Sequence, residues 1–313
     1  MDVVTLGETL ALFRSAGFGP LAHNTAFTLS IGGAESNVAI AIARLGGSAA
    51  WCGRVGADAF GDLILRELRA EEVGVHAVRD SDAPTAHMVR EVRTPSLARV
   101  TYARSGSAGS RLAPSDLPLT TIRAARILHV TGITPALSPT ALDAVLVAVE
   151  EARTHGVTVS FDVNHRSTLW APADAAPVYR RLARDADIVF AGEDEAMLLL
   201  DHDGEAEQLA RGIAALGPRE TIIKRGADGC TALLDDELLR VAAVPIEPVD
   251  TVGAGDAFVG GYLADRAAGR TPEERLITAV ETGAFACLNA GDWAGLPRRS
   301  ELALLSAPDP VLR

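Results

Sequence analysis

The sequence predicts an α/β protein in which a parallel β-sheet is covered by helices on both faces and a smaller β-sheet lies beside it. Short apolar runs alternate with segments of helical periodicity, and the connections between them are short. Two stretches, at about residues 12–30 and 84–104, break this alternation and predict the strands of the small sheet. A small sheet in this position is a natural lid over a ligand.

The N-terminal part of the chain alternates strand and helix. After a first apolar run that ends in glycine, two glycines precede Val38, Ile42 and Leu45, which recur at helical spacing. Gly46 then follows as a C-cap. The expected elements are a strand at residues 1–7, a helix at 31–47, a strand at 49–56 and a helix at 58–74.

The alternation stops at residues 84–104, where two strands are expected around the polar turn Thr94–Pro95–Ser96. It resumes at about residue 123, and Ser138 is the expected N-cap of a helix that ends at Gly156. The remaining expectations are strands at 124–132, 157–164, 186–192 and 220–226, a helix from about 254 and a loose tail at 306–313.

Composition and charge narrow the class of protein. Of 313 residues, 48% are hydrophobic, which excludes a disordered chain, and the net charge of −12 argues against binding to nucleic acid or anionic membranes. The three cysteines are far apart and form no CxxC pair, which favours reduced thiols. We find no secretory signal and no apolar run of about 18 residues, so a cytoplasmic protein without a membrane partner is expected.

Polar residues gather where the predicted strands end. In open parallel sheets, ligands bind at the carboxyl ends of the strands, so these residues are expected to lie close together. They are Gly32–Gly33, Asp162–Asn164, Gly192–Glu195, Lys224–Gly226 and Asp250–Asp256.

The segment DTVGAGDAFVGGYLA, residues 250–264, carries the strongest chemical signal. Gly253, Ala254 and Gly255 precede an apolar helix, whose free N–H groups and dipole would favour an anion. Asp256, in the first turn, is placed to take a proton from an alcohol that attacks a phosphoryl group. The structural alternative is that Asp256 only complements the helix dipole and that the glycines form a turn.

This segment resembles the second signature of the ribokinase-like (PfkB-type) sugar kinase family, and IGGAESNVAIAIARLGG resembles the first. The resemblance spans nearly the whole chain. It implies one domain over residues 1–313, a three-layer α/β/α sandwich with a small β-sheet lid, whose nucleotide-binding half runs from about 160 to 305. It also implies a kinase that uses ATP and Mg²⁺ to phosphorylate a sugar hydroxyl.

The resemblance also implies roles for individual residues. Asp256 matches the catalytic base, and residues 253–255 match the hole that stabilises the transferred phosphoryl group. The matched substrate positions include Gly33 and Asn37, and Glu195 matches a residue that organises Mg²⁺ through water. The nucleotide-side positions are Asn164, Lys224, Gly226 and Gly229. Lys224 is the only lysine of the chain, for which an arginine-rich genome and a selected ammonium group are both explanations.

Two further strings are similar to those of 2-keto-3-deoxygluconate kinases. TYARSGSAGS contains Tyr102 and Arg104, and FDVNHRSTLW contains Arg166; in that subfamily the matching side chains bind the substrate and its carboxylate. Arginine suits this task because its planar fork of donors matches a carboxylate. NAGDWAG places Asp292 at a position that binds a substrate hydroxyl in the subfamily.

The chain departs from the family pattern at three positions. Leu12 stands where ribokinases and fructokinases carry an aspartate that binds sugar hydroxyls, which argues against ribose and fructose. Gly192 stands where the family often has asparagine, with Glu195 kept. Met88 replaces a second substrate tyrosine, which would weaken binding or shift the substrate toward another keto acid.

Three alternatives remain beside a 2-keto-3-deoxygluconate kinase. The first is another kinase of the family, acting on fructose, a nucleoside or a related sugar acid. The second is a sensor that binds a sugar acid without transferring phosphate, against which the intact GAGD argues. A dinucleotide dehydrogenase would need GxGxxG after the first strand, where this chain has GETLAL. A homo-oligomer that pairs through the lid is expected, because a small sheet has open edges, and activation by a monovalent cation is possible.

Overall fold

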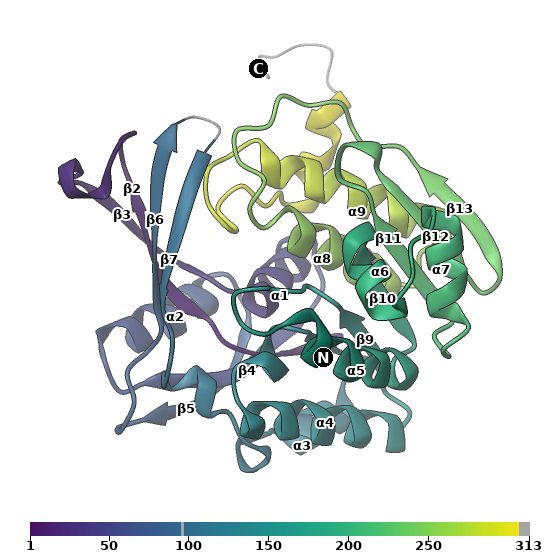
Figure 1. The fold of residues 1–313 in the computed structure, drawn as a ribbon, viewed down its shortest axis with the longest axis horizontal. Helices are drawn as coiled ribbons and strands as arrows, with labels where there is room; N and C mark the ends of the chain where they lie inside the picture. Colours follow the sequence, from purple (N-terminus) through teal and green to yellow (C-terminus); the bar gives the residue numbers. More distant parts are fainter. Residues whose placement is uncertain (95–96, 307–313) are drawn as a thin grey trace.

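The computed structural model describes residues 1–94 and 97–306 and shows a large central sheet with helices on both faces (Figure 1). The nine strands of this sheet lie in the order β13-β12-β11-β10-β9-β8-β1-β4-β5. Their bounds are β1 Val3–Leu6, β4 Ala49–Gly56, β5 Gly74–Asp80, β8 Ile127–Thr131, β9 Thr158–Asp162, β10 Ile188–Gly192, β11 Glu220–Lys224, β12 Cys230–Leu234 and β13 Glu237–Val241.

The sheet is parallel from β5 to β11, as the alternation of strand and helix predicts, but β12 and β13 are antiparallel. A wholly parallel sheet was therefore an incomplete expectation. Two short connections reverse the chain here. Residues 225–229 join β11 to β12, with φ of 54° at Gly226 and 84° at Gly229, and Asp235 and Asp236 join β12 to β13 with φ of 46° and 70°. Two consecutive residues of positive φ form the tight hairpin turn whose twist matches the flanking strands.

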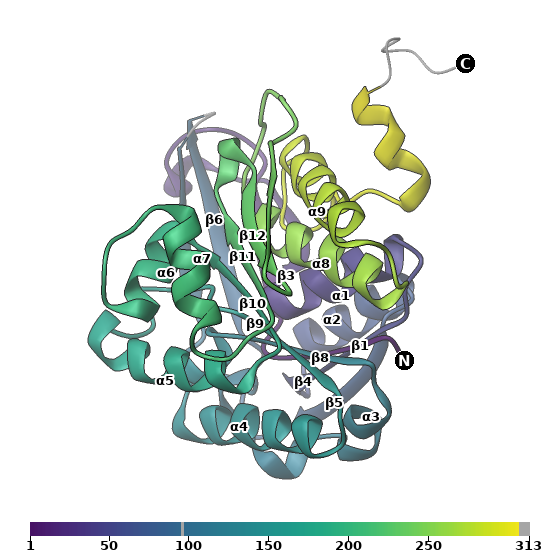
Figure 2. The same ribbon diagram turned by 90° about the vertical axis from the view of Figure 1, so that its right-hand side faces the viewer.

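Two hydrophobic cores flank the central sheet, because neighbouring residues of each strand point to opposite faces. Val3, Phe190 and Ile222 belong to one core, whereas Val4 and Ile223 belong to the other. Helices α1 Ala34–Arg44, α2 Ala59–Ala70, α8 Ala254–Ala267 and α9 Pro272–Cys287 cover the first core, and α3 Leu119–Ala124, α4 Pro139–Thr154, α5 Pro172–Asp185, α6 Glu193–Leu200 and α7 Ala206–Ala214 cover the second (Figure 2).

Helix boundaries follow the local sequence signals. The Ser138 hydroxyl accepts a hydrogen bond from the N–H of Ala141 at 3.1 Å and caps α4, and the chain leaves this helix at Gly156 with a φ of 71°. Short 3₁₀ helices occupy Leu21–His23, Gly109–Arg111, Pro114–Asp116, Thr134–Ala136, Gly226–Asp228 and Arg299–Ser306. In the described part of the chain, we find no helix with the length and apolar character that crossing a membrane requires.

A separate four-stranded sheet has the order β3-β2-β6-β7. We call it the small sheet; its strands are β2 Leu10–Ser15, β3 Phe27–Gly32, β6 His87–Thr94 and β7 Leu97–Ala103. The expected turn residues Pro95 and Ser96 and the tail from residue 307 lie outside the described residues. The register places Leu12 beside Met88, and Met88 beside Tyr102. These three side chains therefore share one face of the small sheet.

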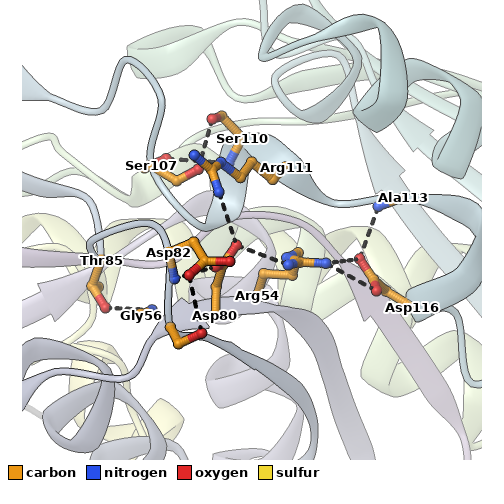
Figure 3. A network of polar contacts seen from close by, with 11 residues as sticks. Arg54, Gly56, Asp80, Asp82, Thr85, Ser107, Ser110, Arg111, Ala113 and Asp116 are labelled. Atoms are coloured by element: carbon orange, nitrogen blue, oxygen red, sulfur yellow. Dashed lines mark hydrogen bonds and ion pairs between the residues drawn. The ribbon is translucent and has the colours of Figure 1, made fainter.

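A network of polar contacts lies where the segment that enters the small sheet meets the central sheet (Figure 3). Arg54 on β4 donates to Asp80 at the end of β5 at 2.8 Å and to Asp116 at 2.9 Å. Beside it, the Thr85 hydroxyl, just before β6, accepts the N–H of Gly56 at 2.8 Å. The chain segment that enters the small sheet is thus attached to the end of β4.

Candidate active site

A cavity of about 780 Å³ is lined by the ends of central strands and by one face of the small sheet. Members of four of the five expected strand-end groups line this cavity, so convergence is confirmed for all but Gly32–Gly33. The small sheet contributes Leu12, Met88, Arg90, Val100 and Tyr102. The opposite side contributes Asn164, Arg166, Gly192, Glu193, Asp194, Glu195, Lys224, Arg225, Thr251, Val252, Gly253, Gly255, Asp256 and Asp292.

The N-terminus of α8 faces this cavity. Gly253 is its N-cap with a φ of 77°, and a Cβ at this position would lie 2.0 Å from the carbonyl oxygen of Asp292, so only glycine fits. The backbone N–H groups that follow are at the start of a 14-residue helix, where the dipole favours an anion. This geometry suits a negatively charged group.

Asp256 lies in the first turn of α8, is 8% exposed and lines the cavity. Two asparagines hold its carboxylate: Asn37 Nδ2 donates to Oδ2 at 2.8 Å, and Asn164 Nδ2 donates to Oδ1 at 3.3 Å. Both donors are neutral amides, and the residues that the structure describes include no ion-pair partner of Asp256. The Asp256 carboxylate is thus held in a fixed orientation at the cavity wall.

Gly33 and Asn37, the two candidate residues of the first signature, do not line the cavity themselves. Gly33 is the N-cap of α1, and a Cβ there would lie 2.6 Å from the carbonyl oxygen of Glu8. Gly33 is not among the cavity-lining residues. Asn37 reaches the site through Asp256. In the first signature, Gly33 therefore lets the N-terminus of α1 pack closely against Glu8, and Asn37 orients Asp256.

Lys224 connects two cavities. Its Nζ donates to both carboxylate oxygens of Asp162 at 2.8 and 2.9 Å. Burial alone would lower the pKa of Lys224, but the negative charges of Asp162 and Glu195 outweigh it and raise that pKa. The ammonium group thus stays protonated between the cavities.

The second cavity, of about 530 Å³, is mainly apolar and adjoins the first at Lys224, Thr251 and Gly255. Gly229 has a φ of 84°, and a Cβ there would lie 2.0 Å from the carbonyl oxygen of Val241. An apolar cavity next to a candidate anion site suits a flat base joined to phosphates. Its walls are formed by Gly226, Ala227, Gly229, Ala243, Val244, Pro245, Ile246, Pro248, Ala254, Phe258, Val280, Gly283, Ala284 and Cys287.

The expected arginines take different positions. Arg166 lines the first cavity. Arg104 is not among the lining residues, because its Nη2 is paired with Glu8 at 2.7 Å and its guanidinium lies 5.5 Å from the ring centre of Tyr102. Arg90, which the sequence analysis did not single out, lines the cavity instead. No local pattern marks Arg90, because its place depends on how the small sheet packs.

Glu195 holds the strand ends at the cavity edge. Its Oε2 accepts the N–H of Gly192 at 2.7 Å, and its Oε1 accepts the N–H of His165 at 2.9 Å. A carboxylate can accept further hydrogen bonds, so it can still bind water on the cavity side. A Cβ at Gly192 would meet Glu195 at 3.5 Å, an ordinary contact, so space alone does not require glycine there.

Asp292 is 8% exposed and lines the cavity. Burial, and secondly the nearby charge of Asp256, raises its pKa from 3.8 to about 7, although Arg90 acts in the opposite direction. At neutral pH, the Asp292 carboxyl therefore exchanges readily between acceptor and donor. Such a group can accept a hydrogen bond from a hydroxyl or donate one to it.

Asp292→Asn is expected to stabilise the fold at pH 7 and above. The folded state holds the proton of Asp292 between pH values of about 4 and 7, so the free energy of unfolding falls as the pH rises through this window. The loss is a few kcal/mol, at about 1.36 kcal/mol per pKa unit. Thermal unfolding at pH 5 to 8 should show a shallower decline in the variant than in the wild type. An unchanged decline would contradict this assignment; exposed Asp228→Asn is the control.

Comparison with known proteins identifies the family. The model of the pfkB family of carbohydrate kinases matches residues 2–299. The chain belongs to this family. This carbohydrate kinase is 37% identical to the 2-dehydro-3-deoxygluconokinase of Bacillus subtilis, over 99% of the chain and 97% of the relative. It is 32% identical to the 2-dehydro-3-deoxygalactonokinase of Haloferax volcanii, over 94% and 93%.

A solved structure supports the fold of this carbohydrate kinase. A fructokinase double mutant of Vibrio cholerae, bound to fructose, ADP and a potassium ion, superposes with a TM-score of 0.85 at 28% identity, over 97% of this chain and 98% of the other. The expected ribokinase-like sandwich with a small separate sheet is therefore confirmed.

Proposed function

We propose that this kinase transfers the γ-phosphoryl group of ATP to the terminal hydroxyl of 2-keto-3-deoxygluconate (2-dehydro-3-deoxygluconate) and forms the 6-phosphate. The observation that carries the proposal is the Asp256 carboxylate, which Asn37 and Asn164 hold at the N-terminus of α8 inside the first cavity. A base beside an anion site is what phosphoryl transfer to an alcohol needs. The names of the two sugar-acid kinase relatives support the substrate.

In this mechanism, Asp256 takes the proton of the attacking hydroxyl. The N–H groups at residues 253–255 stabilise the negative charge on the transferring phosphoryl group. The nucleotide base occupies the apolar second cavity, and Lys224 lies beside the phosphates where the two cavities meet. The small sheet covers the sugar and excludes water that would otherwise hydrolyse ATP.

Magnesium fits this site as a partner of the nucleotide. The described residues contain no group of three or more metal-ligating side chains that could hold a metal ion alone. Mg²⁺ retains several waters and needs only one or two carboxylates beside the substrate phosphates. Glu195 would hold it through water, and the ion would neutralise phosphate charge. A monovalent cation remains a prediction without assigned residues.

The substrate assignment depends on the acid end of the sugar. Arg166 in the cavity wall, and Arg104 if it leaves Glu8, are the candidate partners of the substrate carboxylate. ADP release with 2-keto-3-deoxygluconate, 2-keto-3-deoxygalactonate, fructose, ribose and adenosine tests it. We expect kcat/KM to favour a keto acid by about 10²-fold, or some 2.7 kcal/mol. A preference for fructose would leave the assignment as a sugar kinase in place, but it would replace the keto-acid substrate by fructose.

Arg166→Lys is expected to raise KM for the keto acid far more than KM for ATP, because lysine lacks the planar fork that binds a carboxylate at two points. Initial rates with each substrate varied in turn measure both constants. An equal rise in both constants would place Arg166 on the nucleotide side. Exposed Arg181→Lys, on α5, is the matched control.

We also propose a homo-oligomer that forms through the small sheet. Its edge strands β3 and β7 carry the exposed apolar side chains Phe27, Leu29 and Leu97. Open edges and exposed apolar side chains both favour pairing with a second copy. Light scattering should give a mass that is a multiple of the chain mass, and a monomer at micromolar concentration would contradict this proposal.

A further inference from the structure

We propose that Arg90 is a positioning residue that couples the small sheet to the loop before α8. Its kinetic consequence rests on the proposed function, whereas its structural consequence does not. Arg90 lies on β6 and is 8% exposed. The register places it opposite Val100, two residues from Met88, so it shares the cavity-facing side of the small sheet.

The guanidinium of Arg90 crosses from the small sheet to the loop. Its Nη1 donates to Asp250 Oδ2 at 2.5 Å, and its Nη2 donates to Asp250 Oδ1 at 2.6 Å. Both partners are buried, with side chains 9% and 6% exposed. A two-point pair of this kind fixes distance and orientation together. Movement of β6 must therefore move Asp250 or break the pair.

Asp250 in turn joins two segments of the site. Its Oδ1 accepts the N–H of Val252 at 3.1 Å, and its Oδ2 accepts the N–H of Gly291 at 3.1 Å. Burial would raise the pKa of Asp250, but the bonds from Arg90 and these two N–H groups outweigh it and lower that pKa. The carboxylate is thus ionised and holds four donors from three segments.

Each segment leads directly to a site residue. Val252 precedes Gly253, the N-cap of α8, and Gly291 precedes Asp292. The two segments also touch, since no Cβ fits between Gly253 and the carbonyl of Asp292. A displacement of about 1 Å from the productive geometry can cost about 10²-fold in rate. Arg90 therefore links the position of the small sheet to the position of the anion site.

A direct contact between Arg90 and the substrate is the competing role. Its Nε is buried and has no hydrogen-bond partner within the described residues, so this atom is available. The two Nη atoms, however, are engaged with Asp250. Direct contact would change KM for the sugar and would not depend on Asp250. The positioning role acts only through Asp250 and would mainly lower kcat.

Hydrogen exchange followed by mass spectrometry tests the coupling without any substrate. The full chain is compared as wild type, Arg90→Gln, Asp250→Asn, the double variant and Arg93→Gln. Arg93 lies on the same strand with an exposed side chain that pairs with Glu91, so it is the matched control. The double variant leaves no unpaired buried charge and guards against simple unfolding of the single variants.

We expect faster exchange over residues 250–256 and 289–293 in Arg90→Gln and in the double variant, with Arg93→Gln matching the wild type. Unchanged exchange in the folded variants would overturn the proposal. In the kinase assay, Arg90→Gln should lower kcat about tenfold or more and leave KM for ATP within about threefold. The double variant should be no slower than the slower single variant.

Two results would overturn the coupling in favour of direct contact. One is a loss of kcat in the double variant that equals the product of the losses in the two single variants, and the other is an Arg90→Gln variant in which only KM for the sugar rises. If the wild type phosphorylates none of the sugars, the proposed function fails. The exchange of residues 250–256 then still decides the role of Arg90.

Discussion

Asp256→Asn is expected to lower kcat by roughly 10²-fold or more, because an amide cannot take the proton of the attacking hydroxyl. Asparagine has nearly the same shape as aspartate, and Asn37 can still donate to its side-chain oxygen. The fold and the binding of ATP should therefore persist. Steady-state rates and calorimetric titration with ATP measure the two effects separately.

The control for this variant is Asp228→Asn, which removes the same charge from an exposed side chain of the 3₁₀ turn Gly226–Asp228. It should leave kcat close to that of the wild type. A near-normal kcat in Asp256→Asn would leave Asp256 as a helix-terminal residue and would remove the proposed mechanism. A loss of ATP binding together with kcat would assign Asp256 a binding role instead.

Gly253→Ala is expected to lower kcat by a similar factor, roughly 10²-fold or more, because it displaces donors of the candidate anion site. The added Cβ would lie 2.0 Å from the carbonyl oxygen of Asp292, so one of the two backbone segments must move. The φ of 77° adds strain for any residue with a Cβ. Thermal unfolding should show a loss of about 1–3 kcal/mol from that strain, before the clash is counted.

Gly269→Ala separates these two causes. Gly269 has a φ of 73°, but a Cβ there would have nothing within 4 Å. This variant carries the strain without the clash and lies outside the cavities. It should lose stability and keep its kcat. If Gly253→Ala lost no more activity than Gly269→Ala, the loop before α8 would not form the anion site.

The parts of the site that lie within short segments could be predicted from the sequence. Gly253 and Asp256 belong to one helix start, where the type of residue and its spacing determine the geometry. The strand ends could also be predicted to converge, because parallel strands bring their carboxyl ends to one edge. The hairpin at Asp235 and Asp236 was missed, since this pair carries no glycine to signal a turn of positive φ.

Contacts between distant segments could not be predicted in this way. Arg90 reaches Asp250 across 160 positions of the chain, and Asn37 reaches Asp256 across 219. Both depend on how one layer packs on another, which no local pattern encodes. For the same reason, the sequence pattern singled out Arg104, whose guanidinium is held by Glu8, and passed over Arg90. Whether Arg104 reaches the substrate stays a prediction.

Because Lys224 is the only lysine of the chain, amine-acylating reagents have one side-chain amine to react with in this protein, in addition to the N-terminal amine. Acylation needs an uncharged amine, and the pair with Asp162 keeps the Lys224 amine protonated and 17% exposed. A modified Lys224 would therefore record an opening of that pair rather than ordinary surface chemistry. The rate of adduct formation, followed by mass spectrometry with and without nucleotide, would therefore report how often the ion pair between Lys224 and Asp162 opens.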